Sequence, residues 1–255
     1  MKIIRIVFLL AVFVVAAFYT KLQRLESTAW VDPLSVSIYP INADGRQSTS
    51  QYITSLSNNN FKSVEVFFEK QWSHYSEYGF TPVNVQLMEP IYSQPPEPPS
   101  DGNTLKIIFW SLRLRFWSYQ HAIDSDNNSV NIFVRYQQAD ENKPMAHSLG
   151  LQKGLIGVVN AYAVKQYQEQ NNIVLAHELL HTVGASDKYE LKSGQPIYPE
   201  GFASSDALYE QSKAEIMAGK IPLSEYESVM AETLRHCVIG NKTATEIGWI
   251  ELDMI

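Results

Sequence analysis

The sequence predicts one α+β domain over residues 28–255, preceded by a hydrophobic segment over residues 1–27. Three observations lead to this fold class. Strand-like and helix-like patterns of apolar residues alternate along the chain. The composition is that of a globular protein, with 45% hydrophobic and 18% charged residues. A chain of 255 residues has room for one substantial domain and an appendage.

The first 27 residues differ in kind from the rest of the chain. An unbroken apolar run covers residues 6–19 and follows Lys2 and Arg5. The run is shorter than the roughly 20 residues of a comfortable membrane span, which favours a signal peptide. Interfacial aromatic residues and later positive charges favour an uncleaved signal-anchor instead, and a buried core helix is the third alternative. We expect the domain outside the cytoplasm, periplasmic or extracellular, either membrane-anchored or secreted after cleavage.

Charge and cysteine content exclude several classes of protein. The formal net charge is −7, and lysine and arginine form no cluster, so we expect no nucleic-acid partner. The single cysteine, Cys237, excludes an intrachain disulfide and any zinc knuckle that needs two or more cysteines. We interpret Cys237 as a small buried apolar residue.

Strands and helices alternate in the first half of the predicted domain. Runs of alternating or β-branched residues predict strands over residues 33–40, 82–88 and 130–136. Apolar residues at helical spacing predict an amphipathic helix over residues 61–75, closed by Gly79. Residues 105–119 place apolar side chains on one helical face, although the alternation at 112–116 also fits a strand. Prolines at residues 93–102 predict a stiff surface loop.

The segment before the last predicted helix is rich in glycine. Residues 148–164 contain three glycines, which predicts a bulged or edge strand. Asn171 and Asn172 then offer an N-terminal cap for a helix that reaches Gly184. This order of elements predicts a mixed sheet with helices packed against it.

That last helix carries the sequence HELLH, which has the spacing of a metal site. Residues four apart project from nearly the same helix face, so His177 and His181 can each present a ring nitrogen to one ion. Glu178 lies one step around the helix, where a base acting on metal-activated water should be. Gly184 can end the helix in a left-handed conformation, and the chain can then bring Asp187 to the same ion.

The stretch HELLHTVGASD, residues 177–187, resembles the HExxHxxGxx(H/D) signature of the metzincin zinc peptidases. An aspartate as third ligand resembles the snapalysin-type branch. The same block resembles uncharacterised bacterial exported or membrane-anchored proteins. The resemblance implies a metzincin-like mixed sheet with an active-site helix and a methionine-containing turn beneath the metal. Met217, followed by Ala218 and Gly219, is our candidate for that turn.

The resemblance also implies a zinc-dependent peptidase, most simply an endopeptidase. His177, His181 and Asp187 would hold Zn²⁺, and Glu178 would act as general base toward a water that attacks the peptide carbonyl. The expected partners are a peptide or protein substrate and, through the N-terminal segment, the membrane; the oligomeric state is unknown. Metzincins pair substrate with the strand before this helix, so we expect part of residues 155–161 to bind an extended peptide.

Several alternatives stay open at this point. Rival third ligands are Glu190, Glu200 and Glu210. Met217 can also be ordinary core filling. Some metzincins carry a tyrosine two residues after the methionine; this chain has Gly219 there, and Tyr189 is a candidate replacement. The alternative function is a non-catalytic, membrane-tethered zinc- or peptide-binding protein on the same scaffold.

Overall fold

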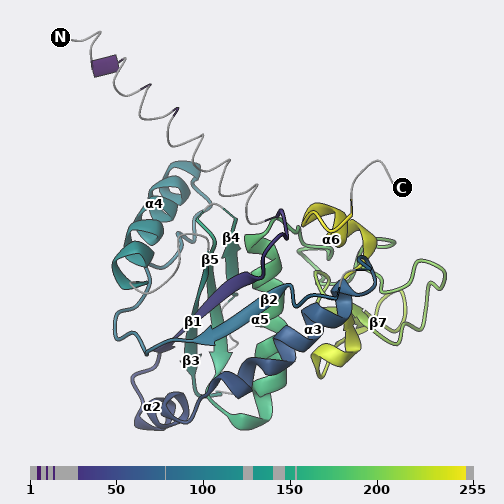
Figure 1. Ribbon diagram of the computed structural model, residues 1–255, viewed down its shortest axis with the longest axis horizontal. Helices are drawn as coiled ribbons and strands as arrows, with labels where there is room; N and C mark the ends of the chain where they lie inside the picture. The colour runs from purple at the N-terminus through teal and green to yellow at the C-terminus, as the bar shows by residue number, and fades with distance from the viewer. Residues whose placement is uncertain are drawn as a thin grey trace.

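A computed structural model gives the fold of the chain (Figure 1). It describes residues 5, 6, 10, 14, 28–77, 79–122, 129–139, 147–152 and 154–250. The predicted hydrophobic segment over residues 1–27 therefore lies almost entirely outside the described residues. Within the described ranges, no helix combines the length and the hydropathy that a membrane crossing requires.

A five-stranded, mostly parallel sheet forms the centre of the fold and confirms the mixed α+β class. The strands are β1 (Leu34–Asn42), β2 (Val83–Leu87), β3 (Val130–Gln137), β4 (Leu149–Leu151) and β5 (Ile156–Tyr162). Their order is β2-β1-β3-β5-β4, and only β4 runs antiparallel to its neighbour. The strands predicted over residues 33–40, 82–88 and 130–136 are confirmed, because runs of Val, Ile and Tyr there fill a core on both faces of the sheet.

The glycine-rich residues 148–164 form two antiparallel strands rather than one edge strand. The chain reverses between β4 and β5, where Gly154 and Leu155 both have positive φ. β5 pairs with β3 along residues 156–162 on one side and with β4 along residues 156–158 on the other. The expectation that part of residues 155–161 binds an extended peptide stays a prediction, and residues 156–158 are already paired with β4. In the described sheet, β4 is the edge strand on this side.

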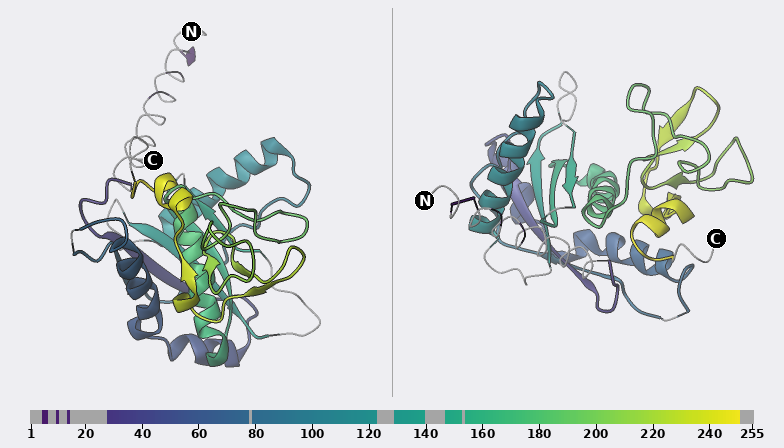
Figure 2. Two further views of the ribbon diagram at one scale, coloured as in Figure 1. Left: turned by 90° about the vertical axis from the view of Figure 1, so that its right-hand side faces the viewer. Right: turned by 90° about the horizontal axis from the view of Figure 1, so that it is seen from above.

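Helices cover both faces of the sheet. Helices α3 (Lys62–Trp72) and α5 (Gln168–Thr182) pack on one face, where strand residues such as Ile38 and Val134 point. Helix α4 (Thr104–His121) packs on the other face, with Trp117 against Phe133 at a ring-centroid distance of 4.7 Å. The right-hand view in Figure 2 shows α4 and α5 on opposite sides of the sheet. Helix α4 is continuous, so the strand alternative at 112–116 is wrong.

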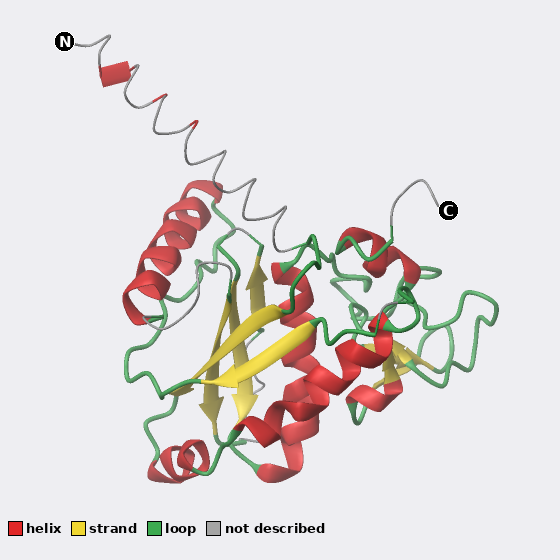
Figure 3. Ribbon diagram, in the orientation of Figure 1, coloured by secondary structure: helices red, strands yellow, loops and turns green. Residues whose placement is uncertain are grey.

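Short elements complete the described fold: α2 (Gln47–Thr54), η1 (Asn58–Phe61), η2 (Lys165–Tyr167), β6 (Ala214–Glu215), β7 (Lys220–Pro222), β8 (Ser228–Met230), η3 (Leu234–His236), β9 (Cys237–Val238) and α6 (Asn241–Glu246). The part of the chain after α5 consists largely of loops (Figure 3). These loops lie beside α5, and the Ile216 carbonyl within them lies 2.9 Å from His177 Nδ1.

Helix α5 begins at Gln168, before the two asparagines that the sequence suggests as its cap. Asn171 and Asn172 lie inside the helix and are buried, so the capping prediction is wrong. The Asn171 side chain accepts from the Tyr162 amide (3.0 Å) and donates to the Tyr162 carbonyl (2.9 Å). Asn172 donates to the Asn60 carbonyl at 2.8 Å. These bonds fix α5 against its neighbours and therefore fix where its two histidines point.

Candidate metal centre

The two histidines of α5 and one aspartate bring three metal-binding atoms together. His177 Nε2 and His181 Nε2 lie 3.1 Å apart. Asp187 Oδ1 lies 3.0 Å from His181 Nε2 and 3.2 Å from His177 Nε2. Atoms held tetrahedrally at about 2.0–2.1 Å from one ion are separated by about 3.3–3.4 Å. The triangle therefore matches a small tetrahedral cation, and it is the only cluster of this kind among the described residues.

Backbone carbonyls orient both imidazole rings. His177 Nδ1 lies 2.9 Å from the Ile216 carbonyl, and His181 Nδ1 lies 2.8 Å from the Ala185 carbonyl. A carbonyl oxygen only accepts, so each Nδ1 carries the proton and donates it. In the neutral imidazole each Nε2 then carries a lone pair and is the atom that binds a metal. Without a metal, a protonated Nε2 can instead donate to Asp187 Oδ1.

Asp187 is an anion in this setting. Burial acts to raise the pKa of its carboxyl group, but hydrogen bonds from His177 and His181, together with their charges, lower it well below the ordinary value. A deprotonated carboxylate is the form that ligates zinc. The charge state of Asp187 is therefore the one that metal binding needs.

The turn that brings Asp187 back to the helix depends on Gly184. Its φ is +112°, as the sequence predicts for the end of α5, and the Ala185 amide donates to the Leu180 carbonyl at 3.0 Å. The backbone on either side of Asp187 is then held in place. The Ser186 amide donates to Glu246 Oε2 at 2.9 Å, and the Lys188 amide donates to the Met217 carbonyl at 3.0 Å.

A buried ion pair supports the same turn. Lys188 is 4% exposed, and its Nζ lies 2.7 Å from Glu246 Oε2. The same ammonium donates to the Ser186 carbonyl at 2.8 Å. Burial acts to raise the pKa of Glu246, but hydrogen bonds from Lys188 and Ser186 outweigh it and lower that pKa below its ordinary value. No motif or spacing in the sequence identifies Glu246 as the partner of Ser186 and Lys188, the two residues on either side of Asp187.

We expect Glu246→Gln to destabilise the fold by about 2 kcal/mol at neutral pH, because it leaves the Lys188 ammonium buried without its counter-charge. This value is smaller than for a fully buried ion pair, because solvent partly reaches Glu246. Glu246 has a lowered pKa when folded, so its contribution is present above the ordinary glutamate pKa and is lost as pH falls through the lowered value. The difference between variant and wild type should shrink in acid, as measured by urea unfolding. Lys242→Gln removes only the exposed partner at 3.7 Å and should change little.

Glu178 provides a buried carboxylate without a hydrogen bond on one of its oxygens. The side chain is 5% exposed, and Oε2 has no hydrogen-bond partner among the described residues. Burial raises the pKa of Glu178, and the opposing charges of His177 and His181 offset only part of that rise. An unsatisfied buried polar atom costs about 1–3 kcal/mol. This oxygen belongs to the residue next to His177, and the pKa of Glu178 responds to the charges of all three residues of the metal-binding triangle.

Met217 lies in a tight turn that is hydrogen-bonded to His177 through the neighbouring Ile216. The Gly219 amide donates to the Glu215 carbonyl at 3.1 Å, and Gly219 has a φ of +72°. Met217 is fully buried, and the residue before it, Ile216, supplies the carbonyl that orients His177. The turn thus fixes the orientation of the His177 ring through the Ile216 carbonyl.

A second buried glutamate, which sequence reasoning did not single out, fixes this turn. One carboxylate oxygen of Glu215 accepts from the Met217 amide at 2.6 Å. The other accepts from Thr243 Oγ1 at 2.7 Å and from the Gly240 amide at 3.2 Å. The only signal in the sequence is one acidic residue inside an otherwise apolar stretch.

The rival ligands lie away from the triangle. Within the described residues, the group whose donor atoms lie within 4.8 Å of one another contains Asp187 and none of the three glutamates. These are Glu190, Glu200 and Glu210, and all are exposed. Tyr189 is half-buried, and its pKa is raised by burial, by the charges of Asp187 and Glu178, and by a hydrogen bond to Asp187. Tyr189 therefore lies at the edge of the site.

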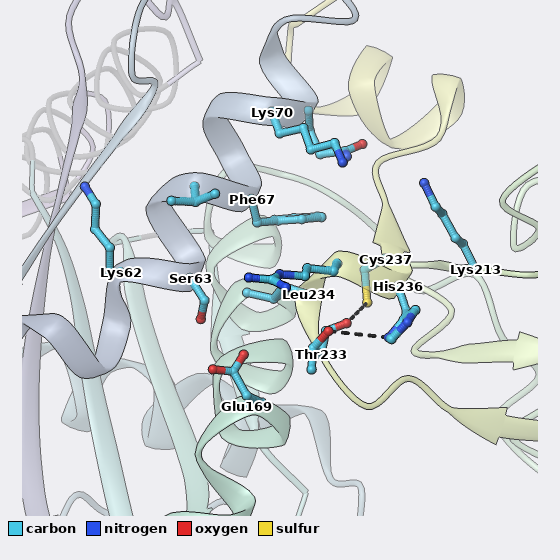
Figure 4. A pocket seen from close by; sticks show the side chains of 13 residues that line it. Lys62, Ser63, Phe67, Lys70, Glu169, Lys213, Thr233, Leu234, His236 and Cys237 are labelled. Atoms are coloured by element: carbon cyan, nitrogen blue, oxygen red, sulfur yellow. Dashed lines mark hydrogen bonds between the residues drawn. The ribbon is translucent and has the colours of Figure 1, made fainter.

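A cavity on another side of α5 offers no comparable chemistry. It has a volume of about 650 Å³ between α3 and the segment 233–237 (Figure 4). Glu169 lines it, eight residues before His177 and so about 12 Å away along the helix axis. Cys237 also lines it; as predicted, this residue is buried, and burial raises the pKa of the thiol to about 12. A protonated thiol is a poor nucleophile.

Comparison with known proteins does not assign a family. No protein-family model matches the sequence, and no curated protein matches it. Among solved structures, wild-type OgpA from Akkermansia muciniphila is similar at 10% sequence identity with a TM-score of 0.42. The matched region covers 84% of this chain and 59% of that chain, so the chain spans less than two thirds of that protein's length. A likeness of this size identifies neither family nor activity.

Proposed function

We propose that this chain is a zinc-dependent peptidase in which His177, His181 and Asp187 hold the metal. The observation that carries the proposal is the triangle of donor atoms next to the unpartnered carboxylate oxygen of Glu178. Two imidazoles and one carboxylate suit zinc, and the same donor set also serves non-haem iron. The free buried carboxylate favours hydrolysis, because a general base is needed there and a purely structural site needs none.

The residues of the chain divide the reaction between them. Bound zinc supplies a Lewis acid that lowers the pKa of coordinated water toward neutrality. The Glu178 carboxylate accepts the proton of the attacking water, and burial makes it a stronger base than an ordinary glutamate. The Glu178 carboxyl group then donates this proton to the leaving amine nitrogen, which closes the proton balance. His177 and His181 stay directed at the site through the carbonyls that hold their Nδ1 atoms.

Because β4 covers residues 156–158 of β5, we take the exposed edge of β4 as the candidate strand that pairs with an extended peptide. A Cβ built on Gly150 would lie 2.6 Å from His181 Cβ and would also contact the Glu178 carbonyl. Only glycine therefore lets β4 lie directly on α5 beside the two metal-binding histidines. A peptide paired with β4 would have its scissile carbonyl near Glu178.

We expect Gly150→Ala to lower the free energy of unfolding by about 1–3 kcal/mol, because the added methyl group forces β4 away from α5. Peptide hydrolysis should fall with it, with KM rising more than kcat falls. Gly79→Ala is the matched control, since a Cβ at Gly79 meets nothing within 4 Å. Thermal unfolding and steady-state kinetics measure the two effects, and equal behaviour of the two variants would contradict the close packing of β4 on α5.

We also propose that the domain acts outside the cytoplasm, attached to a membrane by residues 1–27 or released after their cleavage. The apolar run and its flanking charges in the sequence support this. The substrate is a peptide or protein, and the charge of −7 argues against nucleic acid.

The test is peptide cleavage by the full-length chain with defined metal content. The protein is stripped with a chelator, reloaded with zinc or with ferrous iron, and incubated with a diverse peptide mixture; cleavage is mapped by mass spectrometry. We expect cuts with zinc that vanish on stripping and return on reloading. Stoichiometric zinc without any cut would favour the non-catalytic zinc- or peptide-binding protein. A folded chain that binds no zinc would exclude the proposed metal centre.

A further inference from the structure

Helix α4 has apolar side chains on two opposite faces. One face packs on the sheet through its three buried residues, Leu114, Trp117 and Ser118. The opposite face carries six large apolar residues that are each 50–83% exposed: Leu105, Ile108, Phe109, Leu112, Phe116 and Tyr119. At about 100° per residue these six fall within an arc of about 100°, centred opposite Leu114. We call this set the outer stripe of α4.

The outer stripe is the face that helical periodicity in the sequence identifies, yet it points away from the core. No residue of α4 before Leu114 is buried. Trp110 is partly buried against the core and donates to the Pro96 carbonyl at 2.8 Å, which attaches this end of the helix to the domain and leaves the outer stripe exposed. Soluble proteins seldom expose a contiguous apolar patch of this kind, and such patches mark interaction sites. The fold of the domain therefore leaves the stripe available for a partner.

The charged residues of α4 that border the outer stripe are all cations, although Lys106 also pairs with Asp101 and Arg115 is half-buried. Helix α4 contains Lys106, Arg113 and Arg115, and its 18 residues include no aspartate or glutamate. In helical projection Lys106 and Arg113 flank one side of the stripe and Arg115 flanks the other. This local excess stands out in a chain of net charge −7. An apolar stripe bordered by cations, with aromatic residues on it, is the pattern of a helix that lies in a membrane interface.

We propose that the outer stripe of α4 docks on an anionic lipid bilayer. Its apolar side chains enter the boundary between headgroups and acyl chains, and the two exposed cations, Lys106 and Arg113, contact lipid phosphates. This contact is separate from residues 1–27 and does not depend on peptidase activity. Because α4 and α5 lie on opposite sides of the sheet (Figure 2), docking through α4 turns the metal centre away from the bilayer.

The test places a fluorescent reporter on the stripe of the full-length chain. Leu112→Cys gives an exposed thiol, whereas the native Cys237 is 2% exposed with a pKa raised to about 12, so an environment-sensitive label goes to position 112. Tyr226→Cys, at an 82% exposed position between β7 and β8, is the matched control. Both variants are bound to vesicles of anionic and zwitterionic lipid that carry a quencher in the acyl region. We expect strong quenching at 112 and little at 226.

Removing the cations separates docking from mere proximity to lipid. Lys106→Glu with Arg113→Glu should weaken the contact at position 112 by more than tenfold, since each lost cation near an anionic surface accounts for about fivefold. Vesicles without anionic lipid should give a similar loss. Two outcomes overturn the proposal. One is a label at 112 that stays as water-exposed as the label at 226. The other is a label at 112 that is shielded from both water and lipid, together with a disulfide between two chains in the unlabelled Leu112→Cys variant. That result would assign the outer stripe to contact with a second copy of the chain.

Discussion

Replacing Glu178 with glutamine is expected to lower kcat for peptide hydrolysis by about 10²–10⁴-fold without loss of zinc. The amide has the same shape as the carboxylate but does not accept the proton of the attacking water. Zinc is retained because the three donor atoms of the triangle come from His177, His181 and Asp187. The measurement is steady-state cleavage of a defined peptide at equal zinc content, with metal determined by elemental analysis.

The same substitution should leave the fold intact. Oε2 of Glu178 makes no hydrogen bond to a described residue, so the substitution removes no bond at that oxygen and replaces a buried charge by a neutral group. Glu169→Gln, on the first turn of the same helix, is the matched control and should retain full activity. A Glu178→Gln variant with stoichiometric zinc and wild-type kcat would move the role of general base to another residue.

The part of the site that the sequence predicts is the part that local geometry determines. His177, Glu178 and His181 lie within two turns of one helix, so their spacing alone places both imidazoles on one face. Gly184 and Asp187 follow within six residues of His181, and the left-handed conformation at Gly184 is the expected end of the helix. Short-range rules of backbone conformation therefore sufficed for these five residues.

The supporting residues were not predictable in the same way. The carbonyl that orients His177 belongs to Ile216, 39 residues further along the chain, and Glu246 bonds to Ser186 across 60 residues. No periodic pattern connects positions so far apart in sequence. The strands after α5 are only two or three residues long, which is shorter than any window in which alternation can be recognised.

Tertiary pairing also explains the errors in the fold prediction. Residues 148–164 contain enough glycine for an irregular edge strand, but β5 lies inside the sheet because it pairs with both β3 and β4. Asn171 and Asn172 have the right side chains for a cap, yet their partners are the backbone of Tyr162 and Asn60. In α4 both faces are apolar, so the sequence alone does not say which face the sheet covers.

The second large effect is expected at Asp187. Asp187→Ala should weaken zinc binding by more than a hundredfold, because loss of even an outer partner of a metal ligand typically costs 10–100-fold and Asp187 is proposed to bind directly. Peptide hydrolysis at limiting zinc should fall in parallel. Glu190→Gln is the matched control, since Glu190 is exposed and bonds to Ser193 Oγ at 2.6 Å. Competition with a chelating dye gives the two affinities.

Thermal unfolding with and without zinc distinguishes a metal ligand from an aspartate that only completes the turn. A bound metal stabilises the folded state by about 4 kcal/mol when its concentration is a thousand times Kd, so wild-type Tm should rise with zinc. The turn itself is held by Ser186, Lys188 and Glu246, and these bonds remain in Asp187→Ala. The variant should therefore keep a cooperative transition near the metal-free wild-type Tm and lose the zinc-dependent rise. A variant that unfolds at a much lower Tm but still gains stability with zinc would make Asp187 a structural residue and leave the third ligand to be found elsewhere.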